Sequence, residues 1–414
     1  MFNLSINYHA EPRRKQKKEK WRLFQAKDLQ SLMYPCFTLC HIFGIFPYKI
    51  NAFNLEISKP YYILSTVVTC IFGIYTLIIL FNISFFGKLN MASLPEILAD
   101  CTVYVFGGFI VIVTFILTGP QLRLFQTILM ISSRLPVESY EKLSKLIHTK
   151  DIIGFLVVVP ALFFPTIQFA LTLDYFYLIY TDLVVFLVDM FYMNCVCVLK
   201  ACFKRINDNL TNMKSVIENN ESHISRLNYH DQRNQFLIME LKALKKEHLA
   251  ISDTVQMLNM TFSLHLLATV VMVFSIVTIT LYYYILFCLH LLFNDVPRNV
   301  LHHTSFVMYM LCSTIKITLI VWACETGKNQ AQQMSVSIHD VFNITTNEQI
   351  KYELQLFSLQ ILHCNNTFGA KGLTVDAKLF AEIVGCIATY IIIMFQFKFF
   401  SCEKEMANNI TEVI

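Results

Sequence analysis

Long apolar runs, separated by polar and charged segments, dominate the pattern of this chain. Seven runs are long enough to cross the hydrocarbon core of a bilayer, which takes about 20 helical residues. They cover residues 61–86, 98–118, 152–173, 176–199, 260–290, 304–324 and 379–400. An eighth run, 31–48, is shorter and contains Pro35, Gly44 and Pro47, so we expect an interfacial or re-entrant helix there. The pattern predicts an all-α, multi-pass membrane protein with seven transmembrane helices.

The polar segment before the fifth run also has helical periodicity. No Pro or Gly occurs between residues 166 and 296, so the usual helix breakers are missing there. Apolar residues recur at helical spacing before this run, at Phe236, Leu237, Met239, Leu241, Leu244, Leu249 and Val255. We therefore expect the fifth span to continue as a long cytoplasmic helix that packs against other helices, from this subunit or another. Pro160 and Pro165 predict a kink in the third span.

Basic residues lie almost entirely on one side of the predicted spans. Twenty-eight of the 33 Lys and Arg residues fall before the first span or in the loops 119–151, 200–259 and 325–378. The opposite side has only Lys88, Arg298 and Lys404. Cytoplasmic flanks are enriched in Lys and Arg, so the N-terminus is predicted to be cytoplasmic and the C-terminus external. G-protein-coupled receptors have the opposite orientation.

The composition fits a membrane protein and offers no catalytic chemistry. Of 414 residues, 55% are apolar and only 15% are charged, against about a quarter in soluble domains. The polar N-terminus does not have the pattern of a secretory signal peptide. The 13 cysteines follow neither a disulfide nor a zinc spacing, and the pairs His302–His303 and His363–Cys364 make poor metal sites. We expect no enzyme activity, no cofactor, no metal and no nucleic-acid partner.

The last span contains a distinctive motif, in which Thr389 and Tyr390 are followed by five apolar residues and then by Gln396 and Phe397. This motif resembles the signature of insect gustatory receptors. Three further segments resemble stretches of the same family: 43–48, 357–363 and 368–372. The chain departs from the family at Lys371, where a Cys is frequent. It also has Gln396 where the sugar-sensing branch tends to carry Glu, so a typical sugar receptor is disfavoured.

The resemblance implies a tastant-gated, non-selective cation channel in the cell membrane, in contact with lipid. It implies a homotetramer, or a hetero-oligomer with related receptors, with one central pore lined by the last helices. The chain would then divide into a cytoplasmic N-terminal segment (1–60), a ligand-binding bundle (61–324), a cytoplasmic anchor segment (325–378), a pore-lining helix (379–400) and a short external C-terminus (401–414). A G-protein-coupled receptor and a secondary transporter remain as alternatives.

Three residues of the last span are predicted to form the gate. Ile393, Gln396 and Phe397 have i, i+3, i+4 spacing and share one helix face. Around a pore axis, Ile393 and Phe397 would form an apolar constriction that closes by dewetting. The amide of Gln396 would lose hydrogen bonds in lipid and should face the pore. Thr389 and Tyr390 are expected to pack between helices. Alternatively, the whole motif is a helix-packing device.

Polar residues in the outer halves of spans two to six are candidates for a ligand pocket: Tyr104, Gln168, Tyr177, Asp182, Tyr283 and Tyr309. Any of these tyrosines can instead be an interfacial anchor, as expected for Tyr177. Asp189 and Lys316 each lie roughly 20 Å deep at about 1.5 Å per residue, so we expect them to pair or share a water-filled cavity. The alternative is that each faces backbone or water independently.

Overall fold

The fold is almost entirely helical. The computed structural model describes residues 22–51, 54–85, 101–163, 172–221, 227–293, 300–370 and 372–411. Its helices are α1 (Leu29–Ile42), α2 (Lys59–Phe85), the π-helical turn η2 (Val103–Gly107), α4 (Gly108–Ile116), α5 (Thr118–Ser132), α6 (Val137–Phe163), α7 (Leu173–Glu221), α8 (Leu227–Phe293), α9 (Val300–Ile344), α10 (Glu348–His363) and α11 (Ala377–Thr411). Two antiparallel hairpins join them: β1 (Tyr48–Asn51) with β2 (Asn54–Ile57), and β3 (Gly369–Ala370) with β4 (Leu373–Thr374).

The described helices agree with the predicted spans. Six of them, α2, α6, α7, α8, α9 and α11, are long and apolar enough to cross a bilayer, and a broken pair counts as a seventh. In that pair, Val103–Ile116 meets α5 at a bend of 65°. The second span was expected to end at residue 118, yet the chain turns at Leu117 and continues as α5. Pro120 has no N–H to donate to the carbonyl of Ile116, which accounts for a break at this point.

The first helix is shorter than the interfacial or re-entrant helix expected over 31–48. It has 14 residues, a length of about 21 Å, and therefore cannot cross a bilayer. Residues after Ile42 turn at Gly44, whose φ of +69° favours glycine, and then enter β1. One face of α1 packs into the core against α6 and α7 and consists of Leu29, Leu32, Met33, Cys36, Phe37 and Cys40.

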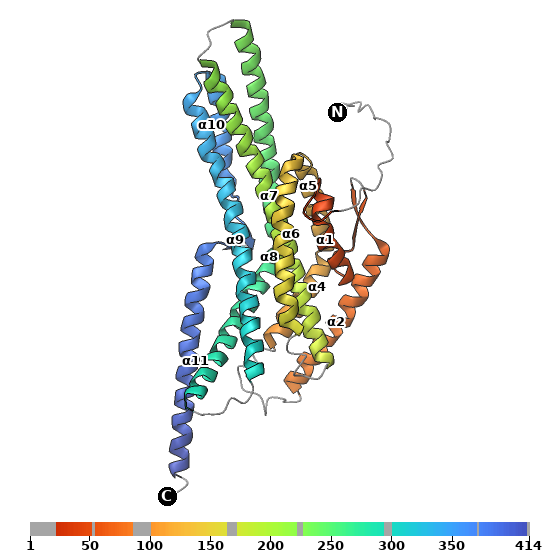
Figure 1. The fold of residues 1–414 in the computed structure, drawn as a ribbon, viewed down its shortest axis with the longest axis vertical. Helices are drawn as coiled ribbons and strands as arrows, with labels where there is room; N and C mark the ends of the chain where they lie inside the picture. The colour runs from red at the N-terminus through yellow and green to blue at the C-terminus, as the bar shows by residue number, and fades with distance from the viewer. Residues whose placement is uncertain are drawn as a thin grey trace.

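Three very long helices organise the molecule. Helix α7 has 49 residues, α8 has 67 and α9 has 45, far more than a bilayer requires. Figure 1 shows them running together to one end of the molecule, where α10 joins them, while α11 and the C-terminus lie at the other end. The continuous helix predicted for the fifth span is confirmed. Its expected apolar stripe is only partly buried, because Leu237, Leu241, Leu244 and Val255 are in the core but Phe236, Met239 and Leu249 are exposed.

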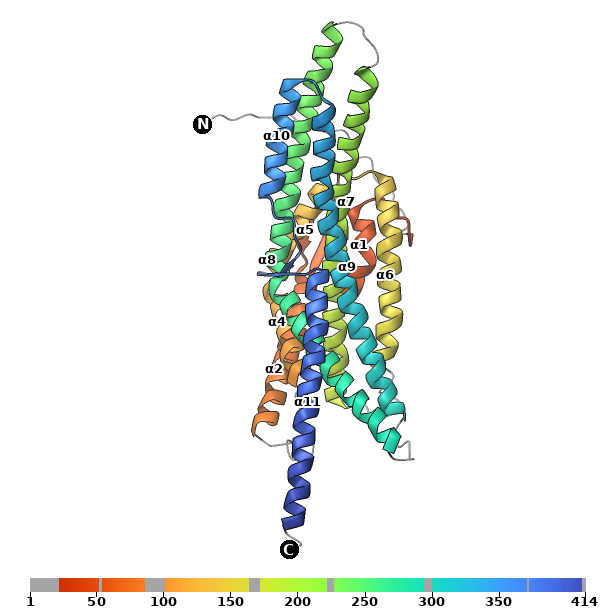
Figure 2. The ribbon, with the colours of Figure 1, turned by 90° about the vertical axis from the view of Figure 1, so that its left-hand side faces the viewer.

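The core is centred on α7, and α11 lies outside it. Within the apolar window of α7, 94% of the residues are buried, and its most extensive contact is with α9. Only 11% of the corresponding window of α11 is buried, by contacts with α8 and α9 (Figure 2). The β3–β4 hairpin lies directly before α11 in the chain. Asn259 of α8 holds this hairpin, donating to the carbonyl of Thr367 at 2.7 Å and accepting from the N–H of Gly369 at 3.0 Å.

Candidate ligand cavity and pore helix

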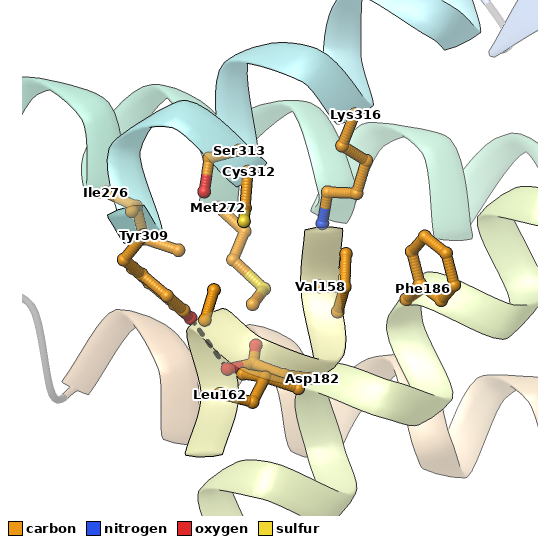
Figure 3. Close-up of a pocket in the computed structure, with 11 residues that line it drawn as sticks. Val158, Leu162, Asp182, Phe186, Met272, Ile276, Tyr309, Cys312, Ser313 and Lys316 are labelled. Carbon is orange, nitrogen blue, oxygen red and sulfur yellow. Dashed lines mark hydrogen bonds between the residues drawn. The ribbon is translucent and has the colours of Figure 1, made fainter. Parts of the chain in front are cut away.

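A small, half-open cavity lies among α6, α7, α8 and α9 (Figure 3). Its volume is about 40 Å³, which is room for roughly three water molecules. The walls are mostly apolar, with a few polar groups from α7 and α9. The lining residues are Val158, Ala161, Leu162, Asp182, Phe186, Met272, Ile276, Tyr309, Cys312, Ser313 and Lys316.

Helical spacing explains why these residues meet. On α9, Tyr309, Cys312, Ser313 and Lys316 stand at i, i+3, i+4 and i+7, so all four share one face. On α7, Asp182 and Phe186 are four residues apart, as are Met272 and Ile276 on α8. Each helix therefore turns a stripe toward the cavity, and the stripes of α7 and α9 carry its charged groups.

A hydrogen bond joins the two sides of the cavity. Tyr309 of α9 donates its hydroxyl to Oδ2 of Asp182 on α7, with 2.8 Å between the oxygens. Figure 3 shows Lys316 reaching from α9 into the same space. A carboxylate and an ammonium group therefore both line a cavity whose other walls are mainly carbon.

Behind the cavity, Asp189 is the centre of a buried polar cluster. Lys316 Nζ lies 3.5 Å from Asp189 Oδ2, so the pairing predicted from helix depth is confirmed. Asp189 Oδ1 also accepts from His265 Nε2 at 2.8 Å and from the hydroxyl of Thr269 at 3.3 Å. The side chain of Asp189 is completely buried, and its Oδ2 has Lys316 at ion-pair distance but no hydrogen-bond donor among the described residues.

His265 belongs to the same buried cluster. Its ring nitrogen Nε2 lies 2.8 Å from Asp189 Oδ1. The other nitrogen, Nδ1, is buried and has no hydrogen-bond partner among the described residues. Lys316 and His265 therefore both lie against one carboxylate, Asp189.

The other predicted pocket residues do not line this cavity. Tyr104 packs against Tyr177 with ring centroids 5.4 Å apart, in a separate cluster beside α2. The hydroxyl of Tyr177 lies 2.6 Å from that of Thr76, and Tyr177 is only 3% exposed. The expectation that Tyr177 is an interfacial anchor is therefore wrong, because α2 covers it. Tyr283 contacts Tyr282 further along α8. Gln168 lies outside the described residues.

Sequence reasoning missed several residues of the site. His265 was detectable as an ionisable residue that interrupts the apolar run 260–290, a pattern that marks functional or paired groups in membranes. Cys312 and Ser313 follow from the helical face that Tyr309 and Lys316 define. Phe186 and Met272 carried no signal, because similar residues fill the whole core.

The family motif lies on a helix with little contact to its own subunit. Tyr390 packs edge-on against Phe274 of α8, with centroids 5.6 Å apart, in line with the expected packing role. The hydroxyl of Thr389 donates to the carbonyl of Gly385 at 3.0 Å, within α11 itself. The three predicted gate residues are exposed: Ile393 at 37%, Phe397 at 70%, and Gln396.

These features define a multi-pass helical membrane protein with a half-open cavity and a largely uncovered terminal helix, and a solved receptor shares the fold. The insect olfactory receptor OR5 from Machilis hrabei matches with a TM-score of 0.67 over 89% of this chain and 98% of that one, at 12% identity. The same receptor in complex with eugenol matches with a TM-score of 0.65 and 11% identity over the same shares. At this identity, the likeness shows the fold alone.

Sequence comparison identifies the family. The profile of the 7tm chemosensory receptors matches residues 33–401, so the chain belongs to this family. Putative gustatory receptor 28b of Drosophila melanogaster is 30% identical over 156 residues, which are 36% of this chain and 32% of that protein. Putative gustatory receptor 28a of the same species is 25% identical over 172 residues, 41% of this chain and 38% of that one. These matches span about a third of each relative. The resemblance to insect gustatory receptors is confirmed.

Proposed function

We propose that the chain is a gustatory receptor that forms a tastant-gated, non-selective cation channel in the cell membrane. The observation that carries the proposal is the exposure of α11. This helix is as apolar as the buried α7, yet its own subunit covers little of it. Its exposed surface includes Gln396, whose amide is costly to leave in hydrocarbon. Other copies of the chain, assembled as a homotetramer around a pore, would cover this surface and hydrate the amide.

The cavity between α7 and α9 supports an external small molecule as the opening signal. Pockets for small ligands typically measure about 300–1,000 Å³, so a cavity of about 40 Å³ has to widen before it holds a tastant. Widening separates α7 from α9 at the hydrogen bond between Tyr309 and Asp182. A tastant that binds the widened form better than the closed form stabilises it.

Helix α9 offers a route from the cavity to the pore helix. It carries Tyr309 and Lys316 at the cavity and Lys328 further along. Lys328 Nζ lies 3.4 Å from Oδ2 of Asp376, the residue directly before α11. Asp376 in turn accepts from the N–H of Leu379 at 3.1 Å and so caps the first turn of α11. A shift of α9 at the cavity would therefore reach the base of the pore helix.

Recording from cells that express this chain alone tests the proposal. A panel of small molecules applied from outside should evoke unitary cation currents in excised patches, where soluble signalling components are lost. Responses that need added G protein would support a G-protein-coupled receptor instead. Substrate-dependent uptake without unitary currents would support a transporter. Tags at both termini should report a cytoplasmic N-terminus and an external C-terminus, and the reverse orientation contradicts the proposal.

A further inference from the structure

The charges around the cavity do not balance. Among the described residues, the cavity and the cluster behind it contain two carboxylates, Asp182 and Asp189, and one ammonium group, Lys316. The ammonium group and the ring of His265 both lie within ion-pair distance of the same carboxylate, Asp189. The other carboxylate is therefore in excess. An uncompensated charge in an apolar interior is costly, so a cation that enters the cavity is favoured.

The excess charge lies on Asp182. Lys316 is within ion-pair distance of Asp189, which has further donors in His265 and Thr269. Asp182 has only one hydrogen-bond donor among the described residues, the uncharged hydroxyl of Tyr309. Its carboxylate also lines the cavity, whereas Asp189 is completely buried behind it. Asp182 is thus the acid that an entering molecule meets.

We infer that the tastant is a protonated amine whose ammonium group binds Asp182. This inference rests on the proposed function and names the class of its ligand. A cavity of about 40 Å³ suits an ammonium headgroup, while the tail would occupy the space gained as the cavity widens. The hydroxyl of Tyr309, released from Asp182 as the cavity widens, can accept a hydrogen bond from the amine. Leu162, Met272 and Ile276 provide apolar contact for an alkyl or aryl tail.

An anionic ligand fits this site less well. Its partner would be Lys316, which it could bind only in competition with Asp189. Success in that competition would take the ammonium group of Lys316 away from the buried Asp189, and the total negative charge of the site would rise. The charge arrangement therefore favours a cation over an anion, and it gives a neutral molecule no electrostatic advantage.

Matched probes test the inference on the purified full-length receptor in lipid nanodiscs. The probes are primary amines from propylamine to 2-phenylethylamine, each paired with the alcohol of the same carbon chain. We expect the amines to bind and to raise the melting temperature, and the alcohols to bind at least tenfold more weakly. Asp182→Asn should weaken amine binding at least tenfold, and Asp182→Glu should restore part of it. Asp208→Asn, which removes an exposed carboxylate elsewhere on α7 and outside the cavity, should change binding less than threefold.

Two outcomes overturn the inference: no amine binds the purified receptor, or amine binding is the same in wild type and Asp182→Asn. Currents in cells then separate this failure from a failure of the channel proposal. Neutral probes that open the channel equally in all variants leave the proposed function in place and remove only the cationic ligand. Binding that depends on Asp182 without any conductance keeps the ligand class and removes the channel.

Discussion

Helices α7 and α11 are about equally apolar, but α7 is buried within the subunit and α11 is largely exposed. In the most apolar window, 94% of α7 is buried and 11% of α11 is. Hydropathy alone therefore shows that a helix leaves water, but not whether protein or lipid surrounds it. The difference lies in the surroundings: α7 contacts α1, α5, α6, α8 and α9, whereas α11 contacts mainly α8 and α9 at the edge of the bundle.

Helix α2 shows that an exposed helix need not contact another subunit. In α2, 17% of the apolar window is buried, and its exposed surface consists mainly of large apolar residues such as Ile63, Leu77 and Phe81. That surface suits lipid. The exposed surface of α11 differs because polar residues occur along its length, at Glu382, Thr389 and Gln396, whereas α2 exposes an amide near its end, at Asn82. The contrast supports lipid as the neighbour of α2 and other subunits as the neighbours of α11.

Matched substitutions on α7 and α11 should differ most in their effect on the yield of folded protein. Val188 of α7 is completely buried, and Val384 of α11 is 52% exposed. Val188→Asn places an unpaired amide in the core at a cost of about 5 kcal/mol, so we expect little folded protein. Val384→Asn should leave the subunit folded. Fluorescence-detected size exclusion measures both yields, and equal losses would show that α11 depends on its own subunit as α7 does.

Breaking the ion pair between Asp189 and Lys316 should have the second-largest effect on the stability of the folded protein. Lys316→Met leaves a buried carboxylate without its cation, which costs about 3–5 kcal/mol. Adding Asp189→Asn removes that charge and should recover most of the lost stability. Thermal unfolding in nanodiscs measures the cycle. Additive effects of the two substitutions would mean that the two charges do not interact.

Burial should also govern how the contact between α8 and α10, where His248 lies against Gln360, responds to pH. Burial lowers the pKa of His248 to about 4 from the usual 6.5. Between these values the unfolded chain binds a proton that the folded chain does not, so stability falls with falling pH, by about 3 kcal/mol in all. His248→Gln should flatten this dependence, measured by denaturant unfolding from pH 7 to pH 4. The same substitution at His363, which is exposed on α10, should leave it unchanged.

The gate substitutions should alter conduction and leave stability almost unchanged. Gln396→Glu adds a carboxylate from each subunit at the proposed pore, so the permeability of divalent relative to monovalent cations should rise several-fold. Phe397→Ala removes the larger side chain of the constriction and should increase current without ligand. Reversal potentials and basal currents measure these effects. Wild-type conduction in both variants, at normal surface levels, would remove these residues from the gate.

The sequence predicted the positions of the helices along the chain better than the contacts between them. Apolar runs depend on the solvent, so they located the spans, and depth within those spans predicted the pair formed by Asp189 and Lys316. The bend at Leu117 and the early end of α1 depend on local backbone groups, and the apolar pattern runs through both. The pocket prediction joined residues at similar depth, yet Tyr104 and Tyr177 face α2 while Asp182 and Tyr309 face the cavity. Depth along a helix follows from residue number, but the direction of a side chain depends on how the helix is rotated in the bundle.

Cysteine cross-linking on α11 tests most directly whether other subunits cover this helix. The background carries Cys70→Ser and Cys386→Ser, which remove the two cysteines that are exposed among the described residues, and also Cys402→Ser. In this background, Ile393→Cys is compared with Ile78→Cys on α2. Both positions are exposed in the single subunit, at 37% and 49%. Oxidation with copper phenanthroline in native membranes should produce covalent dimers through residue 393 and almost none through residue 78. Dimers through residue 78 alone, or through neither position, would contradict an assembly around α11.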